Sequence, residues 1–287
     1  MNKIKLIVDS CASLPMDIVK KYDIEVIPTI FSINDELINP LETNLSVDEF
    51  FDKLNKKVDM KTSGIAPNVY YETFLKYVLD GYDVLSFSLS SGLSGGYNNS
   101  LLAKNMVLEE YPDAKIECID PLTGSIGIYF TVREAIKLVS EGLGVKEIYD
   151  KLNKNGLNIE SLFTIGSLYH LYKGGRLRLA TAAAGALLRI KPLVYASKEG
   201  KLKTGATHIG KKRSLAAMAD RIALNILDDE VFVAYTNNLD EANAFEQMLL
   251  ERNKNLHVTK FLIDYTMMCH CGPETIAAFY KKKTPIE

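Results

Sequence analysis

The sequence has no surplus of positive charge, and this absence argues against one class of partner. Its 287 residues include 34 Lys and Arg against 36 Asp and Glu, which gives a formal net charge of -2 at pH 7. Proteins that bind nucleic acid through its phosphates usually present a basic face. The balance therefore predicts no nucleic-acid partner, although a local basic patch is compatible with it.

Long apolar runs are scarce as well. The stretch MNKIKLIVDS contains a short apolar run that meets Asp9 at once, without the apolar core and small-residue cleavage site of a secretory signal. The least charged stretch, LATAAAGALL at 179–188, is too short to span a bilayer and is followed by Arg189. We therefore expect no stable membrane insertion and a cytoplasmic location.

Cysteine is also rare. The four cysteines, Cys11, Cys118, Cys269 and Cys271, need no disulfide framework in a large domain, so we expect free buried thiols. Two of them flank His270, but the spacing differs from that of a C-x₂-C zinc knuckle, and the sequence has no second Cys/His cluster. In a strand, both cysteines would face away from the histidine. The sequence therefore predicts no metal site.

Expected strands and helices alternate through the first half of the chain. The strands are expected at 4–8, 24–30, 84–89 and 115–119, and the helices at 14–22, 47–54, 67–79, 95–110 and 124–141. Alternation with short connections predicts a mostly parallel sheet that is covered on both faces. Such sheets bind ligands at the carboxyl ends of their strands.

The rhythm changes near Gly156. We expect a strand at 159–163, a helical turn at 167–172, a helix at 178–188, a hairpin of 190–197 and 201–209, helices at 211–227 and 239–251, and strands at 230–235 and 256–263. This half is mixed α/β with an antiparallel pair. The predicted fold class is α/β, with an N-terminal parallel-sheet domain at 1–156, a C-terminal mixed domain at 157–287, and a boundary near 155–158.

Polar turns follow several of the expected strands. The turn Ser90–Gly96 lies between a strand and a helix, where backbone N–H groups and the helix dipole favour an anion. The turn Lys61–Gly64 has the same position after a strand-like stretch, and Asp9-Ser10 is a possible third. In a parallel sheet such ends can point their hydroxyls at one spot. Neither a complete P-loop motif, G-x-x-x-x-G-K-[ST], nor G-x-G-x-x-G occurs, so no nucleotide cofactor is expected.

Two further features have both a functional and a structural interpretation. The glycine loop Tyr172–Arg176 carries Lys173 and Arg176, which are either solvated charges or a docking site for a partner or a phosphate. His270 precedes a Gly-Pro turn, where its imidazole can donate a hydrogen bond to an anion or serve a structural bond.

A serine hydrolase is the rival hypothesis. Gly92-Leu93-Ser94-Gly95-Gly96 matches G-x-S-x-G, which would make Ser94 the nucleophile, His270 the base and Asp264 the acid, in the chain order of an α/β-hydrolase. Against it, the H-G-G-G-type oxyanion motif is missing, and the acid would lie only six residues before the histidine.

Five motifs together resemble the DegV family. In order along the chain they are DSCASLP at 9–15, TSGIAP at 62–67, SSGLSGGY at 90–97, LYKGGR at 171–176 and HCGP at 270–273. The resemblance implies a two-domain fold that buries a long-chain fatty acid such as palmitate. It also implies a lipid-binding protein, not an enzyme, that presents the carboxyl group to a separate fatty-acid kinase subunit for acyl-phosphate formation.

The resemblance also assigns site residues. It implies that Thr62 and Ser94 bind the carboxylate with His270 beside them, and we add their turn neighbours Ser63 and Gly95 as ligand-binding residues. Arg176 is our predicted docking contact for the kinase.

This sequence departs from the family pattern at the site. Gly96 stands where the family usually has threonine, Glu274 replaces the last glycine of H-x-G-P-G, and Cys269 and Cys271 flank the histidine. A carboxylate at 274 would disfavour a bound anion unless it points outward.

Overall fold

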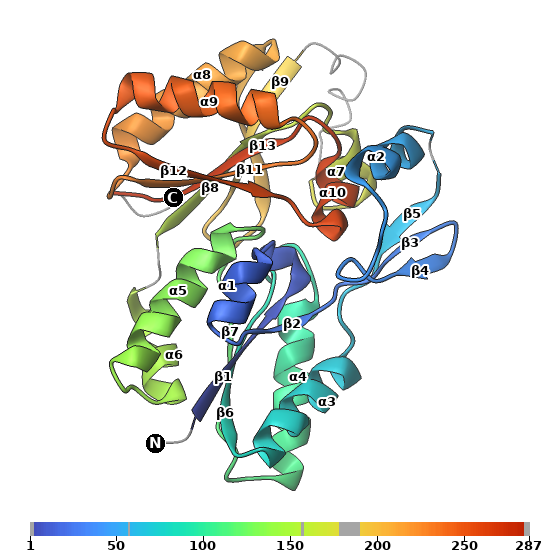
Figure 1. Ribbon diagram of the computed structural model, residues 1–287, viewed down its shortest axis with the longest axis vertical. Helices are drawn as coiled ribbons and strands as arrows, with labels where there is room; N and C mark the ends of the chain where they lie inside the picture. Colours follow the sequence, from blue (N-terminus) through green and yellow to red (C-terminus); the bar gives the residue numbers. More distant parts are fainter. Residues whose placement is uncertain (1–2, 57, 156–157, 178–189, 284–287) are drawn as a thin grey trace.

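The computed structural model describes residues 3–56, 58–155, 158–177 and 190–283. The chain forms two lobes, with the N-terminal lobe at the bottom of Figure 1 and the C-terminal lobe at the top. A small sheet and one helix project to the right of both lobes (Figure 1). The helix expected at 178–188 lies outside the described residues.

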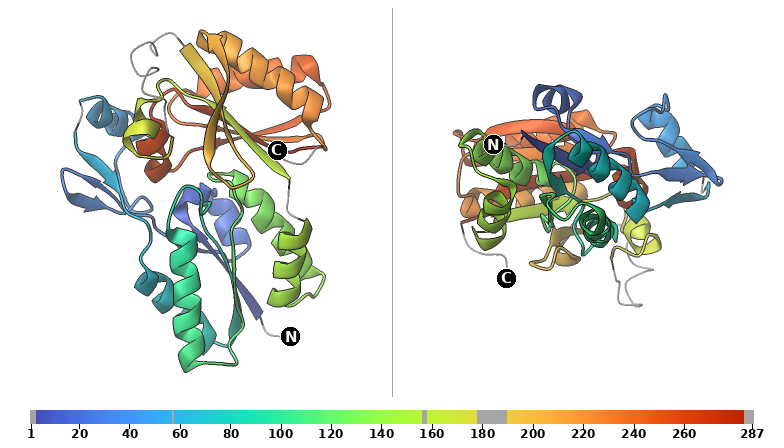
Figure 2. Two further views of the ribbon diagram at one scale, coloured as in Figure 1. Left: turned by 180° about the vertical axis from the view of Figure 1, so that it is seen from behind. Right: turned by 90° about the horizontal axis from the view of Figure 1, so that it is seen from below.

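The N-terminal lobe contains the predicted parallel sheet. Its strand order is β2-β1-β6-β7, and every neighbouring pair is parallel. The four strands are β1 (Lys3–Asp9), β2 (Glu25–Ile27), β6 (Tyr82–Phe87) and β7 (Ile116–Ile119). The lobe's helices are η1 (Ser10–Ala12), α1 (Met16–Lys21), α3 (Pro67–Leu79), α4 (Gly96–Glu110), α5 (Gly127–Ser140) and α6 (Val145–Asn155). Helices α3 and α4 lie on one side of the sheet, and α1, α5 and α6 on the other (Figures 1 and 2).

The C-terminal lobe has a six-stranded mixed sheet of order β10-β9-β8-β13-β11-β12. The pair β11 and β12 is parallel and the other neighbours are antiparallel, including the predicted hairpin of β9 and β10. The strands are β8 (Ile159–Thr164), β9 (Ile190–Ala196), β10 (Leu202–Ile209), β11 (Glu230–Tyr235), β12 (His257–Leu262) and β13 (Ile276–Lys281). The helices are α7 (Tyr169–Lys173), α8 (Lys211–Asn225), α9 (Leu239–Arg252) and α10 (Tyr265–Cys271).

A small antiparallel sheet of order β4-β3-β5 was not predicted. It comprises β3 (Phe31–Ile33), β4 (Glu36–Ile38) and β5 (Met60–Thr62), and it is joined to α2 (Val47–Asn55). The expected strand at 24–30 is therefore wrong in length, because the chain leaves the parallel sheet after Ile27. A capping box begins α2: Ser46 Oγ accepts from the Glu49 amide, and the Glu49 carboxylate accepts from the Ser46 amide.

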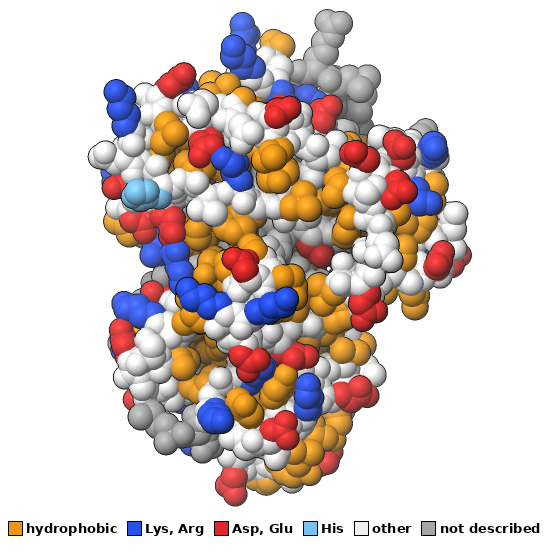
Figure 3. All heavy atoms as spheres, viewed as in Figure 1, with side chains coloured by type: hydrophobic (Ala, Val, Ile, Leu, Met, Phe, Trp, Pro, Cys, Tyr) orange, Lys and Arg blue, Asp and Glu red, His pale blue; other side chains and the backbone are white. Residues whose placement is uncertain are grey.

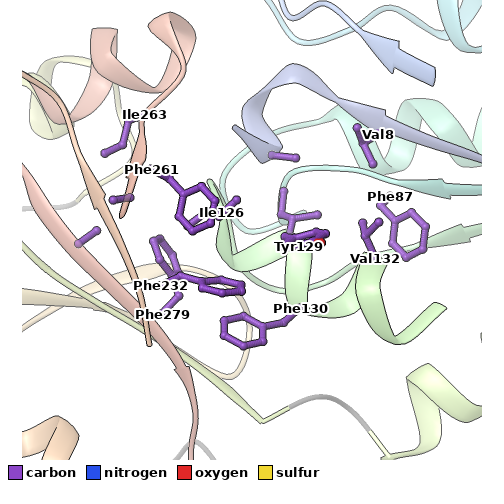
Figure 4. Close-up of a cluster of buried hydrophobic side chains, with 14 of the residues drawn as sticks. Val8, Phe87, Ile126, Tyr129, Phe130, Val132, Phe232, Phe261, Ile263 and Phe279 are labelled. Carbon is purple, nitrogen blue, oxygen red and sulfur yellow. The ribbon is translucent and has the colours of Figure 1, made fainter. Parts of the chain in front are cut away.

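The two lobes share one apolar core. Helix α5 presents Tyr129 and Phe130 to Phe232 of the C-terminal sheet, and Phe130 stacks on Phe232 with ring centroids 4.3 Å apart (Figure 4). The same cluster reaches Val8 of β1 and Phe279 of β13. Separate clusters fill the space under α3 and α4 and under α8 and α9. The shared core fixes the ends of the parallel strands against the C-terminal sheet, where a ligand site is expected.

The surface matches the balanced composition. On the face shown in Figure 3, acidic and basic side chains are interspersed over both lobes. Among the described residues, no helix is both long and apolar enough to cross a membrane.

Candidate functional site

An apolar cavity lies between the lobes at the ends of the parallel strands. It encloses about 900 Å³ of empty space, its mouth included, and residues of both lobes line it, among them Leu89 and Leu93 from one and Phe163 and Phe279 from the other. Arg176 is the only charged side chain among the described residues that line it. Such a cavity suits an elongated apolar molecule with one polar end.

Thr62 and His270 meet at this cavity although 208 residues separate them. The Thr62 Oγ1 and His270 Nε2 atoms are 2.8 Å apart, and both residues line the cavity. Thr62 is the last residue of β5, so it arrives from the small antiparallel sheet and not from the parallel sheet that we expected. The predicted convergence of the two residues is correct, but the predicted route of Thr62 is wrong.

His270 lies on helix α10, and one face of this helix forms part of the cavity wall. Thr266, Met267, His270 and Cys271 all line the cavity, at the spacing of neighbours on a helix face. The strand geometry considered for the Cys-His-Cys segment is therefore wrong. Because Thr266 to Cys271 are helical, Cys271 shares the cavity face with His270.

The Ser94 turn reaches the same place from the end of β6. Ser94 lines the cavity, and its Oγ accepts a hydrogen bond from the Gly96 amide at 3.2 Å. A Cβ atom at Gly64 would lie 3.6 Å from Ser94 Oγ, so the two predicted polar turns touch. Ser63 also lines the cavity. Gly95, by contrast, is exposed and is not one of the described lining residues.

The His270 ring is neutral at physiological pH. Burial, helped by the charges of Arg176 and His170, lowers its pKa to about 4. Its Nδ1 atom is buried and has no hydrogen-bond partner among the described residues. A Cβ at Gly174 would lie only 2.2 Å from that Nδ1, so a glycine at 174 is what lets the ring sit where it does.

Arg176 faces inward. Its Nε donates to the Leu93 carbonyl at 3.1 Å and its Nη1 to the Gly174 carbonyl at 2.6 Å, so it ties the Ser94 turn to the loop after α7. The side chain is half-buried and lines the cavity. Its docking role stays a prediction, to which the structure adds a position in the cavity wall.

The third polar turn has a different role. Asp9 and Ser10 are buried, and neither belongs to the described lining, which at this point is provided by Cys11. Asp9 Oδ2 accepts from the Leu89 amide at 2.6 Å, and Ser10 Oγ accepts from the Thr29 amide at 3.0 Å. These two side chains therefore hold the loops that form the cavity, and the expectation of a third ligand turn is wrong.

The serine hydrolase arrangement is not assembled. His270 Nε2 is hydrogen-bonded to Thr62 Oγ1. Asp264 caps α10, where its carboxylate accepts from the Thr266 amide at 2.8 Å. A nucleophile needs a base within hydrogen-bond reach and an acid that orients this base. Neither link joins Ser94, His270 and Asp264 among the described residues.

The cysteines, and the residues that depart from the family pattern, are compatible with an apolar cavity. All four cysteines are free, and no metal-binding cluster of His, Cys, Asp or Glu occurs in the described part of the chain. Burial raises the pKa of Cys271 to about 12, so this thiol is neutral. Glu274 is exposed and is not among the described lining residues. It adopts φ = 57°, the left-handed region that favours glycine.

Gly96 stands close to a buried tyrosine. A Cβ at this position would lie 3.3 Å from Tyr70 Oη, whose hydroxyl is 3.2 Å from Ser88 Oγ. The threonine that is usual in the family would therefore have to displace Tyr70 slightly. Here the tyrosine occupies that space.

Sequence reasoning missed most of the apolar lining. Phe279 lies on β13, a strand that we did not assign, although IAAFY at 276–280 is a short continuous apolar run of the kind typical of a buried strand. Phe163 lies on the predicted strand β8, but nothing in the sequence says which face of a fully buried strand meets a cavity.

Comparison with known proteins identifies relatives over nearly the whole chain. Residues 3–283 match the family model described as an uncharacterised protein of the DegV family. A DegV domain-containing protein of Clostridium perfringens strain 13 is 33% identical over 287 residues, which cover 98% of each chain.

Solved structures share the fold. A fatty acid (stearic acid)-binding protein of Eubacterium ventriosum superposes with a TM-score of 0.85 at 26% identity over 98% of each chain. The Fatty Acid Kinase (Fak) B3 protein of Streptococcus pneumoniae, loaded with linoleic acid, has a TM-score of 0.82 at 20% identity over 97% of this chain and 99% of that one. At that identity the second likeness concerns the fold alone. From its family match, its relatives and its fold, the chain belongs to the DegV family.

Proposed function

We propose that this protein binds a long-chain fatty acid and presents its carboxyl group to a separate fatty-acid kinase subunit. The observation that carries the proposal is the Thr62–His270 pair beside Ser94 at the polar edge of an otherwise apolar cavity. The stearic acid of the Eubacterium ventriosum structure supports the ligand class.

The carboxylate is held by two hydroxyl donors, one of which His270 orients. The Thr62 and Ser94 hydroxyls each donate to a carboxylate oxygen, and Ser63 extends the same turn. His270 is neutral, so its Nε2–H donates to Thr62 Oγ1, which leaves the Thr62 proton for the carboxylate. Arg176 supplies the positive charge of the wall. None of these groups needs to react with the acid, so the protein holds its ligand and leaves the chemistry to the kinase.

Affinity comes mainly from the acyl chain. Burying one methylene contributes about 0.8 kcal/mol, so a chain of ~16 carbons gains roughly 12 kcal/mol before the costs of ordering and association. Each hydrogen bond at the carboxyl end adds about 1 kcal/mol and sets the orientation of the chain.

The ligand is tested by extracting the purified protein with organic solvent and analysing the extract by mass spectrometry. We expect about one long-chain acid per protein. The absence of any acyl species, together with no uptake of added palmitate or oleate, would reject the proposal. Addition of the kinase subunit and ATP should then give an acyl phosphate, and the protein without that subunit should not consume ATP.

A fluorophosphonate probe separates the proposal from its rival. A protein that only binds the fatty acid should not be labelled at Ser94 and should not hydrolyse p-nitrophenyl esters above background. Labelling at Ser94 that disappears in His270→Ala would instead establish a hydrolase.

A further inference from the structure

A pair of buried hydroxyl groups lies at the wall of the apolar cavity, away from the carboxylate-binding residues. The Thr123 Oγ1 and Ser161 Oγ atoms are 2.6 Å apart, and both residues are buried. Ser161 lines the cavity, whereas Thr123 is not one of the described lining residues. Thr123 follows β7 of the N-terminal lobe and Ser161 belongs to β8 of the C-terminal lobe. Their bond therefore joins the lobes and also places a hydroxyl group in a largely apolar wall.

The strand register places Ser161 far from helix α10, which carries His270. Thr275 and Phe279 both line the cavity, on the same face of β13 and its leading residue. Thr275 Oγ1 donates to the Cys271 carbonyl at 3.1 Å, so this end of the wall lies against α10. Ser161 is the register partner of Phe279. At about 3.3 Å per residue, Phe279 and Ser161 lie roughly 13 Å further along the sheet, where the distal part of a bound chain would be.

The pair has one more hydroxyl proton than it uses. Each hydroxyl has one proton to donate and two lone pairs with which to accept. One proton lies between the two oxygens, and neither side chain has another hydrogen-bond partner among the described residues. When Thr123 donates to Ser161, the Ser161 proton is left for a partner in the cavity. A methylene chain cannot accept that proton, and a buried donor without a partner is unfavourable.

The turn that contains Thr123 adds an acceptor to the same wall. Ser125 lies two residues after Thr123 and also lines the cavity. Its hydroxyl donates to Ser13 Oγ at 3.2 Å, so its lone pairs are what it can offer to a ligand. The wall therefore offers a donor at Ser161 and an acceptor at Ser125, and a hydroxyl group is the small substituent that can accept and donate at once.

We propose that Ser161, held by Thr123, binds a hydroxyl group on the distal part of the acyl chain, which makes hydroxylated long-chain fatty acids a ligand class of this protein. The inference rests on the proposed function and deepens it, because it names a substrate class for the same cavity. The ligand hydroxyl satisfies the pair whichever of the two side chains donates to the other. Ser161 is then a residue that determines specificity, while the carboxyl end is bound as before.

The test compares stearate with two hydroxystearates, which carry the hydroxyl group on the tenth or the twelfth carbon. Calorimetric titration gives the Kd of each acid for the purified protein after removal of any bound lipid. The measured quantity is the selectivity ratio, the Kd of stearate divided by the Kd of a hydroxystearate. A change that only loosens the fold weakens both acids and leaves this ratio unchanged.

Ser161→Ala is the test variant and Ser214→Ala is its matched control. Ser214 Oγ donates to Thr164 Oγ1 at 3.1 Å in a second buried serine–threonine pair. Neither Ser214 nor Thr164 is among the described lining residues of the cavity. The control therefore removes the same hydroxyl group from a similar pair that a ligand in the cavity does not meet.

We expect the selectivity ratio for at least one hydroxystearate to fall about tenfold in Ser161→Ala, because the lost hydrogen bond belongs only to the hydroxylated acid. Ser214→Ala should keep the wild-type ratio within about twofold. If stearate binds but neither hydroxystearate does, or if both ratios are the same in the wild type and Ser161→Ala, the inference is wrong and the proposed function stands. An equal fall in Ser214→Ala would also overturn the inference. If none of the acids binds, the proposed function itself is wrong.

Discussion

The two cavities that meet at Thr62 and His270 differ in what their walls can hold. The apolar cavity has carbon and hydroxyl groups and one charged residue, Arg176. The second cavity, which shares Thr62, Arg176 and His270 with it, is lined by the cations Lys61, Lys173 and Arg176 and the carboxylate of Asp59 among the described residues. A single neutral imidazole and a threonine hydroxyl lie between them. The difference teaches that affinity and orientation come from different regions. Under the proposed function, the apolar wall sets how tightly a lipid binds, and the polar edge sets which end can be modified.

The largest effect is expected from a substitution that displaces His270, whose ring lies between the two cavities. In Gly174→Ala, the new Cβ would lie 2.2 Å from His270 Nδ1, so the ring must move and lose its bond to Thr62. We expect palmitate binding to weaken by about 3–4 kcal/mol, because the displaced ring no longer orients the Thr62 hydroxyl and both groups leave the position in which they meet the carboxylate. Calorimetric titration measures this.

Gly205→Ala is the matched control. A Cβ at Gly205, on β10, meets Tyr195 at an ordinary 3.5 Å, and Gly205 is not among the described lining residues of either cavity. Its palmitate affinity should equal that of the wild type. Equal affinity in Gly174→Ala as well would show that the position of His270 does not matter for binding.

A smaller effect is expected when one hydroxyl is removed from the polar edge. Ser94→Ala should weaken palmitate binding by about 1–3 kcal/mol, the cost of leaving a buried carboxylate oxygen without a donor. Thr62→Val, which keeps the shape of the side chain, should behave similarly. Thermal unfolding should show that both variants remain folded. Wild-type affinity in both variants would show that neither hydroxyl contributes to palmitate binding.

The next effect concerns a carboxyl beneath the apolar cavity. Burial and the nearby Asp264 raise the pKa of Asp9 from 3.8 to about 7. Between these values the folded protein binds a proton that the unfolded chain has released, so stability falls as pH rises through this window, by up to about 1.4 kcal/mol per pH unit. Asp9→Asn cannot ionise but keeps an acceptor for the Leu89 amide.

Urea unfolding across that window measures the effect. The slope of the unfolding free energy against pH should be less negative in Asp9→Asn than in the wild type. What slope remains is expected from Asp264, whose pKa burial raises to about 6. Identical slopes in the two proteins would mean that Asp9 is already ionised in the fold.

The smallest effect is expected outside both cavities. Glu274 is exposed and holds φ = 57°, at a cost that glycine does not have. Its backbone bonds, from the Glu274 amide to Asn237 and from Lys211 to the Glu274 carbonyl, do not need the side chain. Glu274→Gly should raise the free energy of unfolding by about 0.5–1 kcal/mol.

Palmitate affinity should not change in Glu274→Gly. A changed affinity would show that position 274 contributes to palmitate binding. A loss of stability would mean that the Glu274 side chain makes favourable contacts in the fold.

Local chemistry made part of this fold predictable. The expected hairpin of 190–197 and 201–209, two strands joined by a short turn, is a signal within neighbouring residues, and it formed as β9 and β10. The parallel sheet followed from alternation along the chain. The β3-β4-β5 sheet was missed because its strands have three residues each, too few for periodicity to identify.

The site was predictable only in part for a related reason. Motif residues such as Thr62, Ser94 and His270 could be named from the sequence and do converge. The second cavity depends on how α10 lies against α7 and β5, and this long-range packing leaves no local mark in the sequence. Arg176 shows the limit well, since a basic glycine loop gives no indication that its arginine turns inward to the Leu93 carbonyl.

The central claim is tested most directly by a crystal structure of the protein with palmitate. The account predicts one acyl chain in the apolar cavity, with its carboxylate oxygens within about 2.7–3.2 Å of Thr62 Oγ1 and Ser94 Oγ and its methyl end toward Phe163 and Phe279. A chain bound in the opposite direction, or an apolar cavity that stays empty at saturating palmitate, would contradict it.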